Sequence, residues 1–266
     1  MTGSGRIITA IALLGSLLSL ATAASAQSAL EIMERQRTLQ RARDEEETLT
    51  MKLIDKNGAA KQRRLVRYTI IEAGDLSKML IRFLEPRDVE KTGLLTWEAR
   101  DGDDDQWLYL PAVKKVRRIA ASGKKTRFVG SEFAFEDLRP EALALHRYSL
   151  VGSDAVDGQE CWVIEAVPAT DRHASDSGYS KRKLWVRRDN HYSVKQEFYD
   201  KRGALEKIRT DRKVVNVKGT IWRPDEVEMH NVQTGARTLL LVERRRLESG
   251  LDRGLFTETE LIRGGS

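Results

Sequence analysis

Residues 48–71 read TLTMKLIDKNGAAKQRRLVRYTII, and this stretch decides the fold. Leu49 and Met51 alternate with polar residues, which is the period of a half-buried β-strand. Lys56-Asn57-Gly58 is a turn signal, and the residues from Arg64 to Ile71 alternate again. The stretch therefore predicts an antiparallel hairpin with one apolar face.

The same alternation recurs along the chain at short spacing and predicts an antiparallel sheet. The further predicted strands cover residues 79–83, 93–98, 106–110, 116–120, 148–152, 161–167, 182–187, 193–199, 205–210, 213–217, 221–224, 226–230 and 238–243. Helix is expected only at Ser28–Arg43, around 136–145 and at 86–91, and residues 170–180 are expected to form a polar surface loop. The fold class is thus mainly β: a single large curved sheet whose concave face is covered by a few helices.

The first 26 residues have the pattern of a secretory signal peptide. Arg6 precedes the apolar run Ile7–Leu20, and Ala24-Ser25-Ala26 offers a small-residue cleavage site. A retained anchor is the alternative, although the run is short for a membrane span. Cleavage would leave one domain of residues 27–266 in the periplasm, and Gln27 is not the cysteine that a lipoprotein anchor needs.

The charge is high and mixed, with 46 basic and 40 acidic residues and a net charge of +6. Basic residues cluster at Arg63-Arg64, Lys114–Arg118, Lys124–Arg127, Lys181–Lys183 and Arg244–Arg246. Export disfavours nucleic acid as a partner, which leaves solvated outer strand faces or transient contact with anionic lipid head groups. The single cysteine, Cys161, lies in an apolar string and is expected to be a buried, inert thiol.

Motifs of catalysis and cofactor binding are missing from the sequence. There is no G-x-S-x-G elbow and no G-x-G-x-x-G loop, and the four histidines never fall at metal-ligand spacing. Glu136-Asp137 and the aspartates at 103–105 are adjacent carboxylates, which suit a cooperating acid and base poorly. We expect no cofactor, no metal and no catalytic residue; a cell-envelope hydrolase with dispersed groups stays an alternative.

Residues 106–138 read QWLYLPAVKKVRRIAASGKKTRFVGSEFAFEDL and are rich in aromatic side chains. Alternation puts Trp107 and Tyr109 on one strand face, and Phe133 and Phe135 also point the same way. These aromatics can fill the core or, as a group beside Gly130, line the mouth of an apolar cavity.

Three pieces of this stretch, WLYLP, KKVRRI and FVGSEFAFEDL, resemble the outer-membrane lipoprotein-sorting, or LolA-like, family of periplasmic proteins. The branch found beside resistance-nodulation-division exporters is the most similar. Glu132 stands where that branch usually has aspartate. The residues that match its motif are Phe128, Gly130, Ser131, Phe133, Phe135, Glu136, Asp137 and Leu138.

The resemblance implies an incomplete β-barrel of about eleven strands whose hydrophobic hollow carries a lipid or a lipoprotein acyl group toward the outer membrane. Such a protein is a carrier or chaperone and not an enzyme. The resemblance leaves open a non-catalytic adaptor of a membrane exporter as the alternative. The residues expected to line the hollow are Leu94, Trp97, Trp107, Tyr109, Phe133 and Phe135.

Overall fold

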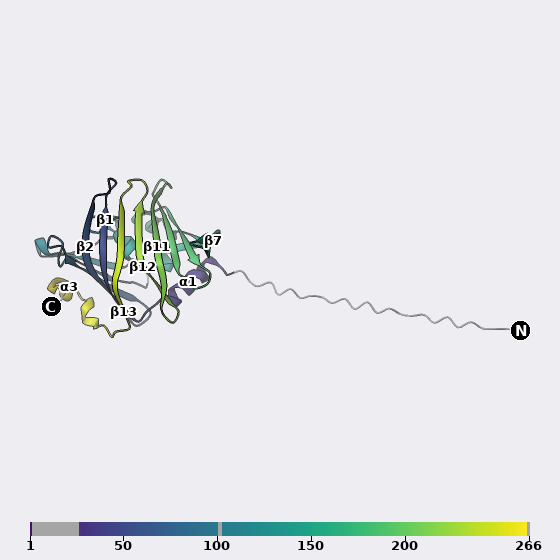
Figure 1. Ribbon diagram of the computed structural model, residues 1–266, viewed down its shortest axis with the longest axis horizontal. Helices are drawn as coiled ribbons and strands as arrows, with labels where there is room; N and C mark the ends of the chain where they lie inside the picture. Colours follow the sequence, from purple (N-terminus) through teal and green to yellow (C-terminus); the bar gives the residue numbers. More distant parts are fainter. Residues whose placement is uncertain (2–26, 101–102, 265–266) are drawn as a thin grey trace.

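The computed structural model describes residue 1, residues 27–100 and residues 103–264 (Figure 1). The predicted signal peptide, residues 1–26, lies outside these ranges apart from Met1. In the described ranges, no helix has both the length and the hydropathy needed to cross a bilayer.

Thirteen strands form one antiparallel sheet, in the order β6-β5-β4-β3-β2-β1-β13-β12-β11-β10-β9-β8-β7. Figure 1 shows them side by side around a curved surface. The strands are β1 Asp44–Ile54, β2 Ala60–Ile71, β3 Ser77–Glu85, β4 Gly93–Trp97, β5 Asp105–Leu110, β6 Lys115–Arg118, β7 His146–Val156, β8 Gln159–Pro168, β9 Lys181–Arg187, β10 Ser193–Tyr199, β11 Leu205–Lys218, β12 Ile221–Asn231 and β13 Arg237–Leu247. The prediction of one curved antiparallel sheet is confirmed.

The strand count exceeds the expected eleven, and two predicted breaks do not exist. Residues 205–217 lie in the single strand β11, and residues 221–230 lie in the single strand β12. Asp211, which lies between the two predicted strands, is accommodated within β11 because it forms an ion pair with Arg209 on the same strand.

The chain crosses the hollow once. It meanders from β1 outward to the edge strand β6, and later returns from the edge strand β7 to β13, which pairs with β1. Residues 119–145, here called the crossing segment, connect these two edges and contain short 3-10 turns at Phe128–Gly130, Phe135–Leu138 and Leu143–Leu145. Their aromatic side chains pack on the concave face of the sheet against residues such as Phe83.

Helix α1, Ala29–Leu39, covers the concave face over β8 and β9. Ser28 caps it, since its hydroxyl accepts from the Glu31 N–H while the Glu31 carboxylate accepts from the Ser28 N–H. Ile32 and Met33 are buried against Ile164 and other residues of β8 and β9. The helix ends four residues before the predicted Arg43 because β1 already begins at Asp44.

The convex face of β2 to β5 has a cover of its own, which the sequence did not predict. The 3-10 turn Arg253–Phe256 and helix α3, Glu258–Arg263, lie against this face. A third short helix, α2 (Asp171–Asp176), lies inside the predicted polar loop, and residues 86–91 form a turn instead of a helix. The helices therefore cover parts of both faces, and not the concave face alone.

Candidate functional site

Three cavities open on the concave side, and Pro140 lines all of them. Residues 139–142 of the crossing segment, here called the strap, separate them. The sheet cavity lies between the strap and β1, β2, β3, β12 and β13, the polar cavity between the strap and β9 to β11, and the helix cavity between the strap and α1. Their volumes are about 310, 200 and 290 Å³.

The sheet cavity has an apolar end. On β1, Leu49 faces the cavity, and it pairs with Val242 of β13. The apolar lining of this end consists of Leu49, Met79, Phe133, Leu138, Val227, Leu240 and Val242. Such a surface can accommodate hydrocarbon without losing a hydrogen bond.

The other end of the sheet cavity is charged but internally neutralised. The buried carboxylate of Glu47 forms ion pairs with Arg67 and Arg245, and Glu45 pairs with Arg223. Burial opposes ionisation of Glu47, but the two guanidinium groups lower its pKa below the ordinary value. Hydrocarbon is therefore disfavoured at this end, so the cavity is apolar at one end and charged at the other.

Side chains hold the strap in place. Glu141 forms a bidentate pair with Arg182 of β9, at 2.9 and 2.7 Å, and accepts a hydrogen bond from the Tyr148 hydroxyl at 2.5 Å. Although burial opposes it, the Arg182 guanidinium lowers the pKa of Glu141 to about 2. Arg139 reaches Asp103 at 3.4 Å. The ion pairs thus fix both ends of the strap.

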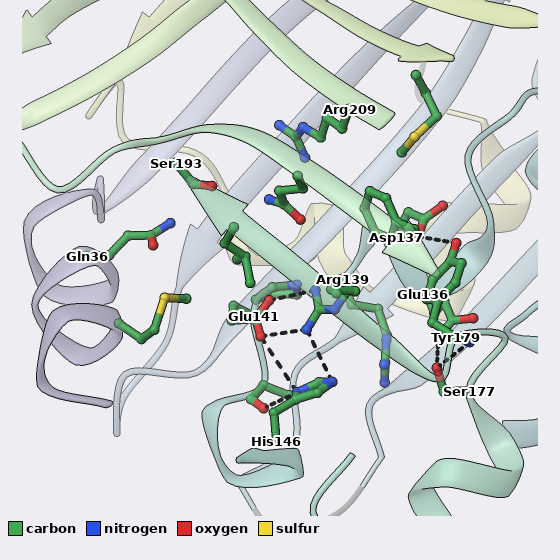
Figure 2. A pocket seen from close by; sticks show the side chains of 18 of the residues that line it. Gln36, Glu136, Asp137, Arg139, Glu141, His146, Ser177, Tyr179, Ser193 and Arg209 are labelled. Atoms are coloured by element: carbon green, nitrogen blue, oxygen red, sulfur yellow. Dashed lines mark hydrogen bonds and ion pairs between the residues drawn. The ribbon is translucent and has the colours of Figure 1, made fainter. Parts of the chain in front are cut away.

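The polar cavity contains buried polar atoms that lack a hydrogen-bond partner among the described residues: Gln36 Oε1, Arg139 Nε and Ser193 Oγ. In Figure 2 the side chains of Gln36 and Ser193 point toward the part of the chain that carries Arg139 and Glu141. Ser193 is 6% exposed and the Arg139 side chain 7% exposed, so bulk water does not replace the missing partners.

The predicted motif forms the loop that closes the apolar end. The Phe128 N–H donates to the Phe133 carbonyl at 2.7 Å, and Gly130 has a φ of +74°, a left-handed conformation that favours glycine. The Ser131 hydroxyl donates to the Phe128 carbonyl. The ring of Phe128 packs on Phe83 and Phe135, so these motif residues shape the loop and anchor it to the sheet.

The motif carboxylates also have partners within the fold. Glu136 accepts from Ser177 and Gly178, and burial raises its pKa. Asp137 accepts from the Tyr179 hydroxyl and pairs with Lys207 at 2.8 Å. Glu132 pairs with Arg127 at 3.0 Å. These contacts attach the crossing segment to β11 and to the loop before β9.

The six residues predicted to line the hollow fall into two groups. Leu94, Phe133 and Phe135 lie in the core of the concave face, and Phe133 lines the sheet cavity. Trp97, Trp107 and Tyr109 lie on the convex face under the C-terminal segment, where the Trp97 indole donates to the Phe256 carbonyl at 3.0 Å. The structure therefore does not bring the two groups together.

Several residues that line the cavities were not predicted from the sequence, because they are polar. Glu45 and Glu47 share a strand face with Leu49, so strict alternation along β1 already places them inside. Lys124 lines none of the three cavities, but it too departs from the prediction, since it belongs to a predicted exposed basic run and its ammonium is buried against the Asp104 carbonyl. No feature of the sequence around Gln36 or Ser193 indicates that these residues line a cavity.

Cys161 is buried, as predicted, and burial raises the pKa of its thiol. Over the described ranges, no group of three or more histidine, cysteine or carboxylate side chains is arranged to hold a metal ion.

Comparison with known proteins supports the assignment that the motif suggested. A family model described as "Uncharacterized protein" matches residues 75–263. No curated protein matches the chain.

Comparison with solved structures finds proteins that share the fold of this chain. A Vibrio parahaemolyticus domain described as a "putative outer membrane lipoprotein-sorting protein domain" is 33% identical, with a TM-score of 0.83 over 88% of this chain and 98% of that one. A DUF1329 family protein from Desulfovibrio piger is 27% identical, with a TM-score of 0.81 over 88% and 97%. A LolA superfamily protein from Nitrosomonas europaea shares the fold at 20% identity, with a TM-score of 0.68 over 88% and 100%. The chain belongs to the outer membrane lipoprotein-sorting family.

Proposed function

We propose that the protein is a periplasmic carrier that holds a lipid, or the acyl group of a lipoprotein, in the sheet cavity. The observation that carries this proposal is the apolar end of that cavity, which is lined by seven apolar side chains beneath the strap. Each methylene group buried there would contribute about 0.8 kcal/mol of binding free energy.

Two further observations support the proposal. The Vibrio parahaemolyticus relative, one-third identical over nearly its whole length, is described as a lipoprotein-sorting protein domain. The first 26 residues of this chain have the pattern of an export signal, which fits a role between the two membranes.

The strap is the element that would move when cargo binds. Within the described chain, its backbone N–H groups make no hydrogen bond to other backbone, so side chains such as Glu141 and Arg139 hold it. A segment held in this way can shift without breaking the sheet. Docking on an exporter and contact with a membrane surface stay predictions.

The experiment that tests the proposal compares two tryptophan variants on β13. Val242 lines the sheet cavity, whereas its neighbour Leu241 points from the opposite face of the strand. We expect Val242→Trp to fill the apolar end and reduce uptake of a fluorescent fatty acid at least tenfold, and Leu241→Trp to leave uptake near the level of the unmodified protein.

Native mass spectrometry of protein purified from the periplasm provides the second measurement. It should detect a bound lipid or acylated species in the unmodified protein and less of it in Val242→Trp. Protein that is always empty and takes up no labelled lipid would contradict the carrier function.

A further inference from the structure

We propose that the cargo is a single-chain amphiphile with an uncharged, hydrogen-bonding head. This inference rests on the proposed carrier function and specifies its substrate class. The acyl chain would occupy the apolar end of the sheet cavity, and the head would occupy the polar cavity on the other side of the strap.

The volume of the sheet cavity limits the tail. A dry cavity of roughly 150 Å³ holds one benzene ring, and the sheet cavity, at about 310 Å³, is about twice as large. The whole cavity therefore has room for about a dozen carbon atoms, and its apolar end alone has room for fewer. With the strap in the position described, one medium-length chain fits this volume, whereas the several chains of a diacyl lipid or a lipoprotein anchor do not.

The unpartnered atoms of the polar cavity define the head. Gln36 Oε1 can only accept a hydrogen bond, Arg139 Nε can only donate one, and the Ser193 hydroxyl can do either. A buried polar atom without a partner is costly, so a native cavity with such atoms is suited to a ligand that completes them. The complementary head carries both donors and acceptors, as a glycerol or other polyol group does.

The charges around the polar cavity favour an uncharged head. Its three guanidinium groups already have carboxylate partners: Arg139 pairs with Asp103, Arg182 with Glu141, and Arg209 with Asp211. Burial together with the nearby Arg182 lowers the pKa of His146 to about 4, so its ring is neutral at neutral pH. An ionised head would bring an uncompensated charge into this partly closed space.

The two cavities adjoin in a way that suits one molecule. Asp137, Arg139, Pro140, Tyr192 and Arg209 line both of them, so the strap and the facing sheet residues form a shared boundary. A head at Ser193 and Gln36 would be continuous with a chain that passes this boundary toward Leu138 and Val227.

The first test compares ligands that share a twelve-carbon chain. Binding of monolauroylglycerol and of methyl laurate to the full mature protein would be measured by displacement of an uncharged fluorescent fatty acid methyl ester below the critical micelle concentration. We expect monolauroylglycerol to bind at least tenfold more tightly, because methyl laurate has no donor for Gln36. Phosphatidylethanolamine with two acyl chains should compete poorly.

The second test removes the unpartnered groups one at a time. Ser193→Ala and Gln36→Met should each weaken monolauroylglycerol binding about threefold to tenfold. Gln36→Met should leave methyl laurate binding unchanged, because methyl laurate has no donor for the Gln36 oxygen. Neither change removes a hydrogen bond at the named atom within the described fold, so both variants should remain folded. Ser149→Ala, on the exposed edge strand β7, is the matched control and should bind both ligands normally.

The outcomes separate this inference from the carrier function. Equal affinity for the two laurates, no effect of either variant, or tight binding of the diacyl lipid alone would overturn the single-chain, polar-head inference and leave the carrier function standing. Failure of every lipid to bind would overturn both.

Discussion

Buried charge and hydrogen bonds determine how single residues act in this protein. Glu141 and His146 are neighbours in one local network, in which Arg182 contacts both side chains and His173 contacts the His146 ring. The guanidinium keeps Glu141 ionised, whereas burial and the same guanidinium keep His146 neutral. As the pH falls, His146 is therefore protonated before Glu141, so the charge of the network changes first at His146.

The first prediction concerns that histidine. The pKa of His146 is lowered from 6.5 to about 4, so the folded state prefers the neutral ring. The stability that this preference contributes is fully present above pH 6.5 and is lost as the pH falls through 6.5 toward 4. We expect the free energy of unfolding to fall by about 2 kcal/mol between pH 7 and pH 4.5 on this account.

Urea unfolding at the two pH values measures this effect. His146→Gln should show a smaller fall than the unmodified protein, while the remaining fall reflects other groups such as His173, whose pKa burial also lowers. His230→Gln on β12, where His230 is paired with Ile208 and Arg237, is the control and should keep the full dependence. An equal fall in all three proteins would show that His146 does not contribute.

Helix α1 illustrates how an element depends on one buried face. Ile32 is completely buried against β8 and β9, whereas Leu30 on the same helix is 44% exposed. We expect Ile32→Ala to lower the free energy of unfolding by about 2 to 5 kcal/mol, and Leu30→Ala to change it by about 0.5 kcal/mol or less. Urea unfolding would check both values, and similar losses would mean that α1 is not docked as described.

The alternation of apolar and polar residues predicted the strands well, because this pattern is present wherever one face of a strand is polar. On β1 and β2 it gave the hairpin and its apolar face. On β3 it could not tell which face is concave, because Leu80 is as apolar as Met79 and Ile81 on the other side. For the same reason, alternation could not tell whether Trp97, Trp107 and Tyr109 face the hollow.

The site was less predictable than the fold. The motif from Phe128 to Leu138 located the loop over the apolar end, and Phe133 and Leu138 line the cavity. The polar cavity depends on Gln36, Arg139 and Ser193, which come from a helix, the strap and a strand. Nothing in their local sequence brings these residues together, because the crossing segment and the sheet order do so.

At the scale of the whole molecule, the first half of the sheet has an apolar layer on each of its two faces. Phe256 is completely buried in the convex layer together with Leu80, Leu95 and Trp107, whereas Ile262 of α3 is 51% exposed. We expect Phe256→Ala to cost about 3 to 5 kcal/mol of stability, with increased binding of a hydrophobic dye. Ile262→Ala should be nearly neutral. Thermal unfolding with dye binding measures both, and a stable, dye-silent Phe256→Ala would argue that the C-terminal cover is dispensable.

The pairing of β1 with β13 has a consequence for how the chain is assembled. Strand β1 is the first strand in the chain, but one of its two neighbours is the last strand, β13. Residues 44–54 can pair on that side only when residues 237–247 have been synthesised. Before that moment the nascent polypeptide holds two separate meanders, β1 to β6 and β7 to β12, joined by the crossing segment. Contacts between residues so far apart in the sequence form slowly. A chain truncated before β13 would therefore contain two half-sheets that no strand joins.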